Sequence, residues 1–249
     1  MCDMLGISTS KPLPLDERLW RLFFKRGRYN PDGWGVAWYN GKKAIVTKSP
    51  RKASHAIAER FLKRYSTART GIVIAHLRGA SVGKVVCENT HPFYRSLFGR
   101  AYAFAHNGHL DHASQLSVGR FVPHGQTDSE RIFCHLLDCI EKRKIKVWTR
   151  ASMAWLAKTL REINKDFGTT KKKYGKMNLL FSDGELLFFY HDINGFNRYW
   201  TLQQHDGHTS RFVISMTKLT REPWRRARKG SLVVVRKGKI VYQSIGEKN

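Results

Sequence analysis

The stretch MCDMLGIS, residues 1–8, places a cysteine directly after Met1 and before an apolar run. The alternating apolar residues after Cys2 predict a β-strand, in which a cysteine could serve as a small core side chain. A second interpretation is chemical: removal of Met1 would leave Cys2 with a free α-amine beside its thiol. The two interpretations predict different proteins, and the rest of the chain has to decide between them.

Length and composition indicate a globular protein. The chain has 249 residues, of which 41% are hydrophobic and 12% aromatic, so it can bury a core without disulfides or metal. It contains neither an apolar run of about 18 residues nor a signal-peptide pattern, and we therefore expect a cytoplasmic protein without membrane segments. The four cysteines Cys2, Cys87, Cys134 and Cys139 form no CxxC pair, which favours free thiols.

The charge balance is strongly basic, with 45 Lys and Arg against 19 Asp and Glu, a net charge of +26. Basic runs occur at residues 142–146, 171–173 and 221–229. Such a balance suits a nucleic-acid or other polyanion partner. No helix-turn-helix, RNA-binding or zinc-finger pattern accompanies the runs, however, and net charge speaks to solubility more than to fold. A solvated basic surface is the preferred interpretation, and polyanion binding is the alternative.

Periodicity predicts an α+β protein that is rich in strands. Alternating or β-branched runs predict strands at residues 4–8, 33–39, 44–48, 71–77, 102–106, 177–182, 185–191, 212–216, 231–236 and 239–244. Helical spacing appears at residues 52–65, 128–141 and 149–164, with Thr127 or Asp128 as N-cap of the middle helix. The polar stretch 168–175 is the expected flexible loop before a strand-rich C-terminal third. Strands in runs, with helices grouped between them, favour antiparallel sheets covered by helices.

Polar motifs stand at the ends of several predicted strands, where sites are commonly built. They are NPDGWG at 30–35, AHLRGAS at 75–81, NTHPF at 89–93, FAHNGHL at 104–110 and QTDSE at 126–130. In this set and order, beginning with Cys2, they resemble the class II glutamine amidotransferases, a branch of the N-terminal nucleophile (Ntn) hydrolases. The chain is most similar to the short stand-alone members. The resemblance is strong over about residues 1–135 and weak beyond.

The resemblance implies a single glutamine amidotransferase type-2 domain over residues 1–249. Its fold would be an αββα sandwich of two antiparallel sheets between helical layers, with the strands of residues 176–249 completing the sheets. It also implies that Met1 is cleaved and that Cys2 is the nucleophile. Amide hydrolysis through a thioester needs a thiol, a base and oxyanion donors, and a neutral terminal amine can act as that base near neutral pH.

By the same resemblance, the Asn107 side chain and the Gly108 backbone N–H form the oxyanion hole. Taken alone, Asn107–Gly108 would be an ordinary hairpin turn. Arg78 corresponds to the residue that binds the substrate α-carboxylate, Ser81 to a hydroxyl position that contacts substrate, and Asp128 to the acid that pairs with the α-ammonium. Arg78 and Asp128 would then clamp a γ-glutamyl group.

One departure concerns the leaving group. Fuller family members carry RWAT where this chain has Arg78 followed by Gly79, Ala80 and Ser81, so a bulky ring is missing. Trp34 or Trp38 is the candidate replacement. The leaving group is therefore open between ammonia from glutamine and the amine of a larger γ-glutamyl compound.

Three functions from different classes follow. The preferred one is a cysteine-dependent amidohydrolase acting on glutamine or a γ-glutamyl amide, without cofactor or metal, with a separate ammonia-accepting synthase subunit or a second copy as candidate partners. The second is a non-catalytic Ntn-fold protein that binds nucleic acid or another polyanion. The third is a metal-dependent hydrolase using His106, His109, Asp111 and His112, whose spacing fits no HExxH pattern.

Overall fold

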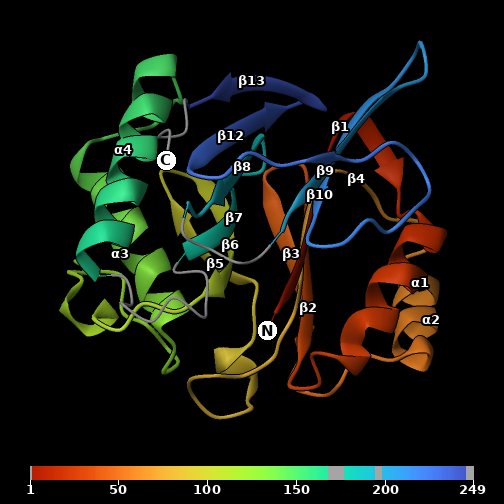
Figure 1. The fold of residues 1–249 in the computed structure, drawn as a ribbon, viewed down its shortest axis with the longest axis horizontal. Coiled ribbons are helices and arrows are strands. Elements are labelled where there is room, and N and C mark those ends of the chain that lie inside the picture. The colour runs from red at the N-terminus through yellow and green to blue at the C-terminus, as the bar shows by residue number, and fades with distance from the viewer. Residues whose placement is uncertain (1, 168–176, 194–197, 245–249) are drawn as a thin grey trace.

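Two antiparallel sheets pack face to face in the computed structural model, which describes residues 2–167, 177–193 and 198–244 (Figure 1). The seven-stranded sheet has the order β11 (Arg225–Arg226), β9 (Trp200–His205), β10 (Ser210–Ser215), β1 (Asp3–Pro14), β4 (Arg69–Leu77), β2 (Trp34–Asn40) and β3 (Lys43–Ser49). The six-stranded sheet has the order β13 (Lys239–Gln243), β12 (Ser231–Arg236), β8 (Leu186–His191), β7 (Met177–Ser182), β6 (Arg100–Gly108) and β5 (Phe93–Leu97).

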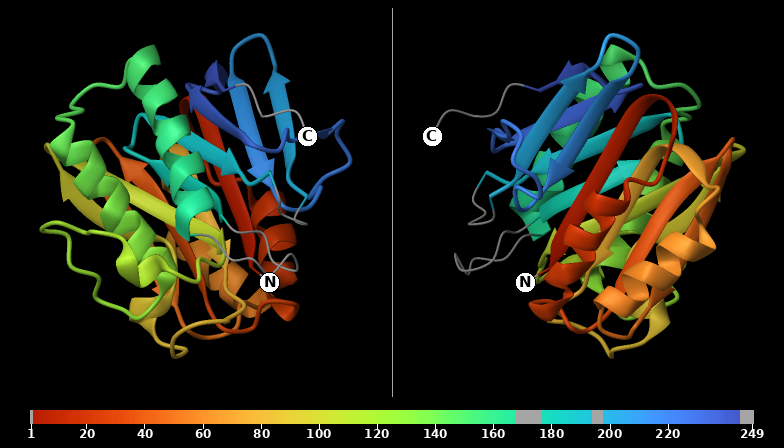
Figure 2. Two further views of the ribbon diagram at one scale, coloured as in Figure 1. Left: turned by 60° about the vertical axis from the view of Figure 1, so that its left-hand side comes forward. Right: turned by 90° about the vertical axis from the view of Figure 1, so that its right-hand side faces the viewer.

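Helices cover the outer face of each sheet. Helices α1 (Glu17–Lys25) and α2 (His55–Arg64) lie against the seven-stranded sheet, and α3 (Asp128–Lys142) and α4 (Arg150–Phe167) against the six-stranded one (Figures 1 and 2). Three 3-10 turns complete the elements of the described residues: η1 (Arg26–Arg28), η2 (Cys87–Asn89) and η3 (Ala113–Gln115). The predicted αββα sandwich is confirmed.

The alternation of side chains along each strand builds three apolar layers. In β1, Leu5 and Ile7 pack toward α1 and α2, whereas Met4 faces the opposite sheet. In β6, Phe104 packs toward α3, whereas Ala105 faces β1 and its neighbours. Because both faces of both sheets are covered, the period-2 pattern separates two apolar faces here instead of an apolar and a polar face.

All the predicted strands and helices are present, with ends that differ by a few residues, and β1 extends to Pro14. The hairpin predicted across residues 237–238 is also present, with positive φ at Lys237 and Gly238, as a two-residue turn between strands requires. The predicted loop at 168–175 lies outside the described residues. The elements not predicted are α1, β5, β9, β11 and the 3-10 turns.

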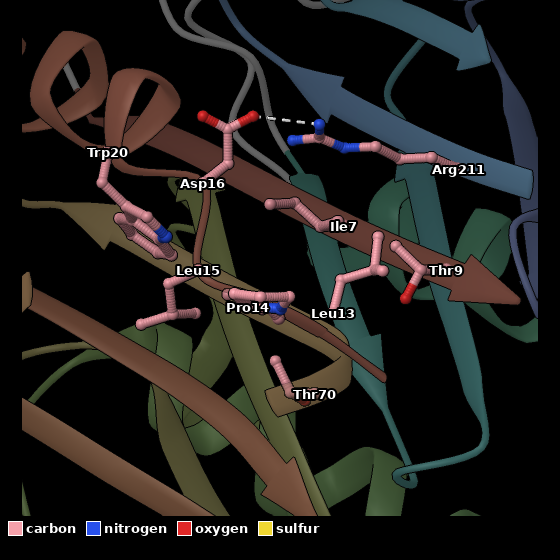
Figure 3. A pocket seen from close by; sticks show the side chains of 10 residues that line it. Ile7, Thr9, Leu13, Pro14, Leu15, Asp16, Trp20, Thr70 and Arg211 are labelled. Atoms are coloured by element: carbon pink, nitrogen blue, oxygen red, sulfur yellow. Dashed lines mark hydrogen bonds and ion pairs between the residues drawn. The ribbon is translucent and has the colours of Figure 1, made fainter. Parts of the chain in front are cut away.

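Helix α1 is amphipathic and begins at a regular cap. The Asp16 side chain accepts a hydrogen bond from the Leu19 N–H, and Leu19, Trp20, Phe23 and Phe24 are buried. Beside the start of α1, a cavity of about 40 Å³ lies between β1 and β4 (Figure 3). Asp16 and Arg211 line this cavity and form an ion pair, with 3.0 Å between Arg211 Nη1 and Asp16 Oδ2. The cavity lining also includes Ile7, Thr9, Leu13 and Pro14 of β1, toward the end of the strand opposite to Cys2.

Candidate active site

Cys2 lies immediately before β1, beside the end of β4. Asp3 pairs with Leu77, so the residues after β4 pass next to the cysteine. The Gly79 N–H lies 3.4 Å from Cys2 Sγ, and the thiol is half-buried. Burial raises the pKa of the Cys2 thiol, and the Gly79 hydrogen bond and the Arg78 charge offset this only in part. The thiol is therefore protonated at neutral pH and needs a base to react.

Asn107 lies at the end of β6 and reaches across to Cys2. Its Nδ2 is 2.9 Å from the Cys2 carbonyl and 2.9 Å from the Tyr199 hydroxyl, with Met216 Sδ at 3.3 Å. The predicted position of Asn107 and Gly108 at a strand end is confirmed. The hairpin-turn interpretation is wrong, because Asn107 pairs with Asn178 within the sheet.

Asn178 holds Asn107 from the neighbouring strand. Its Nδ2 donates to the Asn107 carbonyl at 3.0 Å, and its Oδ1 accepts from the Asp192 N–H at 3.0 Å. All three residues are buried. The sequence motifs gave no sign of Asn178 or Tyr199, which reach Asn107 only through sheet pairing and packing.

An ion pair with Arg26 anchors Asp3, the residue after Cys2. Asp3 accepts hydrogen bonds from Arg26 Nε and Asn30 Nδ2, both at 2.9 Å. Burial raises the pKa of the Asp3 carboxyl, and these two donors lower it only part of the way. Asn30 belongs to the NPDGWG motif, whose role as a support for β1 was not predicted.

Arg78 is engaged by the loop that follows it. Its guanidinium donates to the carbonyls of Val82 at 2.9 Å, Lys84 at 3.1 Å and Gly83 at 3.3 Å. The same loop is held by Asp32, whose carboxylate accepts from the Ala80 N–H at 2.8 Å, and it leaves Ser81 exposed. In this structure the arginine thus organises residues 79–84, directly beside Cys2.

Thr127, not Asp128, caps α3. The Thr127 hydroxyl accepts from the Glu130 N–H at 3.2 Å, which leaves the Asp128 carboxylate for other partners. Asp128 Oδ2 accepts from the Leu110 N–H at 2.9 Å and lies 3.4 Å from His109 Nδ1. Burial acts to raise the pKa of Asp128, but His109 and the Leu110 N–H outweigh it, so the pKa lies below its usual range.

A cavity of about 330 Å³ opens beside Asp128, with His109, Asp111 and Val82 in its wall. Val82 comes from the loop that Arg78 holds, so the surroundings of Arg78 and Asp128 meet at this cavity. Asn89 connects them: its Nδ2 donates to the Lys84 carbonyl at 3.0 Å and its Oδ1 accepts from the Gln126 N–H at 2.7 Å.

The remaining candidates have other partners. His106 Nδ1 lies 2.9 Å from the Ser129 hydroxyl, and His109 contacts two carboxylates. Within residues 2–167, 177–193 and 198–244, no three His, Cys, Asp or Glu side chains form a group that could hold a metal ion. Trp34 and Trp38 are buried and pack on Phe61, so the proposal that either replaces the missing ring is wrong.

The basic runs lie at the surface where the structure describes them. Arg221, Arg225, Arg226 and Arg228 are exposed, and the run at 171–173 lies outside the described residues. No helix in the described part of the chain is long and apolar enough to cross a membrane.

Comparison with known proteins gives a consistent result. The family model for class-II glutamine amidotransferases matches residues 1–211. An uncharacterized protein of Methanocaldococcus jannaschii is 34% identical over 98% of this chain and 72% of its own length. YafJ of Escherichia coli, named as a candidate glutamine amidotransferase, is 34% identical over 78% of this chain and 74% of its own length.

Solved structures agree. A 2.0 Å crystal structure of a glutamine amidotransferase predicted in Pseudomonas aeruginosa is 25% identical, with a TM-score of 0.67 over 97% of this chain and 100% of that one. Glutamine phosphoribosylpyrophosphate amidotransferase of B. subtilis shares the fold, at 17% identity and a TM-score of 0.68, over 100% of this chain and 50% of that one. The chain belongs to the class-II glutamine amidotransferase family.

Proposed function

We propose that this protein is a cysteine-dependent amidohydrolase that cleaves the side-chain amide of glutamine, or of a γ-glutamyl compound, through a thioester on Cys2. The observation that carries the proposal is the 2.9 Å contact between the Asn107 amide and the Cys2 carbonyl. This contact supports a role for Asn107 as an oxyanion donor beside Cys2. Cys2 is the cysteine that becomes the N-terminal residue, with a free α-amine, once Met1 is removed. Family membership supports the same assignment.

The first half-reaction forms the thioester. The free α-amine of Cys2, with an ordinary pKa of about 7.7–8.0, takes the proton of the half-buried thiol. The sulfur attacks the γ-carbonyl carbon. The Asn107 amide, turning one N–H from the Cys2 carbonyl to the substrate, and the Gly108 N–H then donate to the oxyanion that develops. The carbon–nitrogen bond then breaks, and the nitrogen leaves with the proton from the Cys2 ammonium.

The second half-reaction releases the acid. The same amine takes a proton from a water molecule, which attacks the thioester carbonyl, and the carbon–sulfur bond breaks to give glutamate and the thiol. Arg78 and Asp128 are assigned to the α-carboxylate and α-ammonium, and Ser81 to a further substrate contact. Ammonia released in this way would pass to a separate synthase, whereas a γ-glutamyl amide would release its own amine.

Intact-mass analysis after incubation with 6-diazo-5-oxo-L-norleucine, a glutamine-like electrophile, tests the proposal. We expect a chain that lacks Met1 and carries a single adduct, because the reagent needs both the γ-glutamyl head-group contacts and the activated thiol. Cys2→Ala should remain unlabelled. Cys87→Ala, which removes an exposed free cysteine, should label like the parent.

Two results would contradict the proposal. Retention of Met1 in protein that hydrolyses glutamine would remove the terminal amine as base. An adduct lost in Cys87→Ala but kept in Cys2→Ala would show ordinary surface thiol reactivity.

A further inference from the structure

His109 lies between two carboxylates at the cavity beside Asp128. Its Nε2 is 2.9 Å from Asp111 Oδ1, and its Nδ1 is 3.4 Å from Asp128 Oδ2. The Asp128 side chain is only 10% exposed, and the His109 side chain 32%. The imidazole therefore contacts the carboxylate that the proposed function assigns to the substrate ammonium. It lies on the cavity side of that carboxylate.

The charges around this histidine favour its protonated form. The two carboxylates at the ring are Asp111, two residues along the chain, and Asp128 of α3. Arg131 of α3 lies in the wall of the same cavity and, as a cation, opposes protonation, whereas His106 of β6 contributes to the low pKa of Asp128. The nearby Asp128 carboxylate raises the pKa of His109 above its usual value, burial opposes this, and Asp111 adds to the rise. In its protonated form the ring is a cation held between the Asp111 and Asp128 carboxylates.

We propose that His109 is a proton-controlled specificity residue, whose imidazolium competes with the substrate ammonium for Asp128. This inference rests on the proposed function, because it takes Asp128 as the ammonium partner. The Asp128 carboxylate is partly satisfied already, because Oδ2 faces the imidazolium and the Leu110 N–H and Oδ1 accepts from the Ser129 hydroxyl at 3.4 Å. A second cation gains less from it than from an unpaired carboxylate, and two like charges at one carboxylate repel each other.

The direction of the pH effect follows from this competition. Below the pKa of His109 the imidazolium is present, and substrate binding has to displace the proton or the ring. Above it the ring is neutral, and Asp128, whose pKa is lowered, stays ionised on both sides. The Kd for an α-amino substrate should therefore fall as pH rises through the His109 pKa, by at most about tenfold per pH unit for one linked proton.

Calorimetric binding of L-glutamine to the Cys2→Ala variant between about pH 5.5 and 8.5 tests this, because that variant binds without turnover and without the titration of the Cys2 thiol. Titrations in two buffers of different ionisation enthalpy count the protons released. We expect release of up to one proton per L-glutamine on the acidic side. Glutaramate, which is glutamine without the α-amino group, should bind with no such release.

Variants locate the proton. His109→Gln in the Cys2→Ala background should abolish the proton release and flatten the pH dependence of Kd. His112→Gln is the matched control, because His112 is an exposed histidine of the same segment. Asp111→Asn keeps the imidazole but removes one of its carboxylates, so the profile should move to lower pH. The cavity-facing position of His109 makes these variants compatible with folding, which thermal melting verifies.

The outcomes separate the two proposals. If the number of protons released on L-glutamine binding is the same in His109→Gln as in the Cys2→Ala background, the role of His109 is overturned. The proposed function is unaffected by that result. Absence of binding of both L-glutamine and a γ-glutamyl anilide at every pH overturns the proposed function and this inference with it.

Discussion

The side-chain amide of Asn107 donates a hydrogen bond of 2.9 Å to the main-chain carbonyl of Cys2, and so joins the end of β6 in one sheet to the start of β1 in the other. The proposed nucleophile and its proposed oxyanion donor thus come from different sheets. The site exists only when the two sheets are packed against each other. Contacts between the sheets are therefore part of the catalytic arrangement as well as of the core.

Replacement of Asn107 tests the oxyanion assignment. Asn107→Ala should lower kcat by about 10²–10³ and leave KM nearly unchanged, because the lost hydrogen bond acts on the transition state. Steady-state hydrolysis of glutamine measures both constants, and a melting curve checks the fold. A rise in KM at constant kcat would instead make Asn107 a residue for binding or for local structure.

Tyr199 is the residue that orients this amide. Its hydroxyl is fully buried and accepts from Asn107 Nδ2 at 2.9 Å. Tyr199→Phe leaves one hydrogen of the Asn107 amide without this acceptor, which should lower the free energy of unfolding by about 1–3 kcal/mol. Because the amide is then less well oriented, kcat should fall by roughly tenfold at unchanged KM. Tyr39→Phe is the matched control, because Tyr39 is also buried and donates to the Ser182 carbonyl. Both variants should melt earlier; an equal kcat in the two would contradict a role for Tyr199 beyond stability.

The sequence was sufficient for the elements with a clear period. Strands such as β7 and helix α3 were predicted with nearly the observed ends, because their apolar positions repeat at two and at 3.6 residues. Helix α1 was missed although Asp16 and the spacing of Leu19, Trp20, Phe23 and Phe24 carry a helical signal. The edge strand β11 has only two residues, too few for a pattern, so only its pairing with β9 defines it.

The candidate site was predictable only where motifs mark it. Asn107 and Asp128 lie in recognisable motifs at the ends of elements. Tyr199 and Asn178 meet Asn107 across 92 and 71 residues of chain, and no local pattern encodes such a contact. The hydrogen bonds from Arg78 to loop carbonyls and the contact of the His109 imidazole with Asp128 could not be predicted from the sequence either. Both depend on the conformation of a loop.

The packing between the sheets can be tested at a glycine. A Cβ on Gly6 of β1 would lie 2.8 Å from Ile214 Cγ2 and 2.9 Å from Leu180 Cδ2, a side chain of the opposite sheet. Gly6→Ala should therefore destabilise the fold by about 1–3 kcal/mol, measured by denaturant unfolding. Gly71→Ala in the neighbouring β4 is the control, since its Cβ would meet nothing nearer than 3.7 Å. Equal stability of the two variants would mean that the sheets do not pack as described.

The last prediction concerns Arg78, for which the structure offers a second role. A guanidinium that binds three loop carbonyls can serve as a loop organiser, whereas the proposed function needs it on the substrate α-carboxylate. The two roles are compatible if the substrate carboxylate takes over donors that the loop now uses. Hydrogen exchange at residues 79–86 should then become faster when L-glutamine binds to Cys2→Ala, and remain unchanged with 4-aminobutanamide, which lacks the carboxylate.

Arg78→Lys separates the roles by substrate. An ammonium cannot reproduce the bidentate contact with a carboxylate. The value of kcat/KM for glutamine should therefore fall by roughly thirtyfold or more, which corresponds to a loss of about 2 kcal/mol of transition-state stabilisation. Activity on 4-aminobutanamide should be low in the parent and hardly altered in the variant, and Cys2 should still react with a small uncharged thiol reagent. If Arg78→Lys lost activity equally on both substrates, and its loop exchanged faster without any ligand, then Arg78 would support Cys2 through residues 79–84. The γ-glutamyl assignment would in that case lose its carboxylate partner, and Asp128 alone would have to account for recognition of the head group.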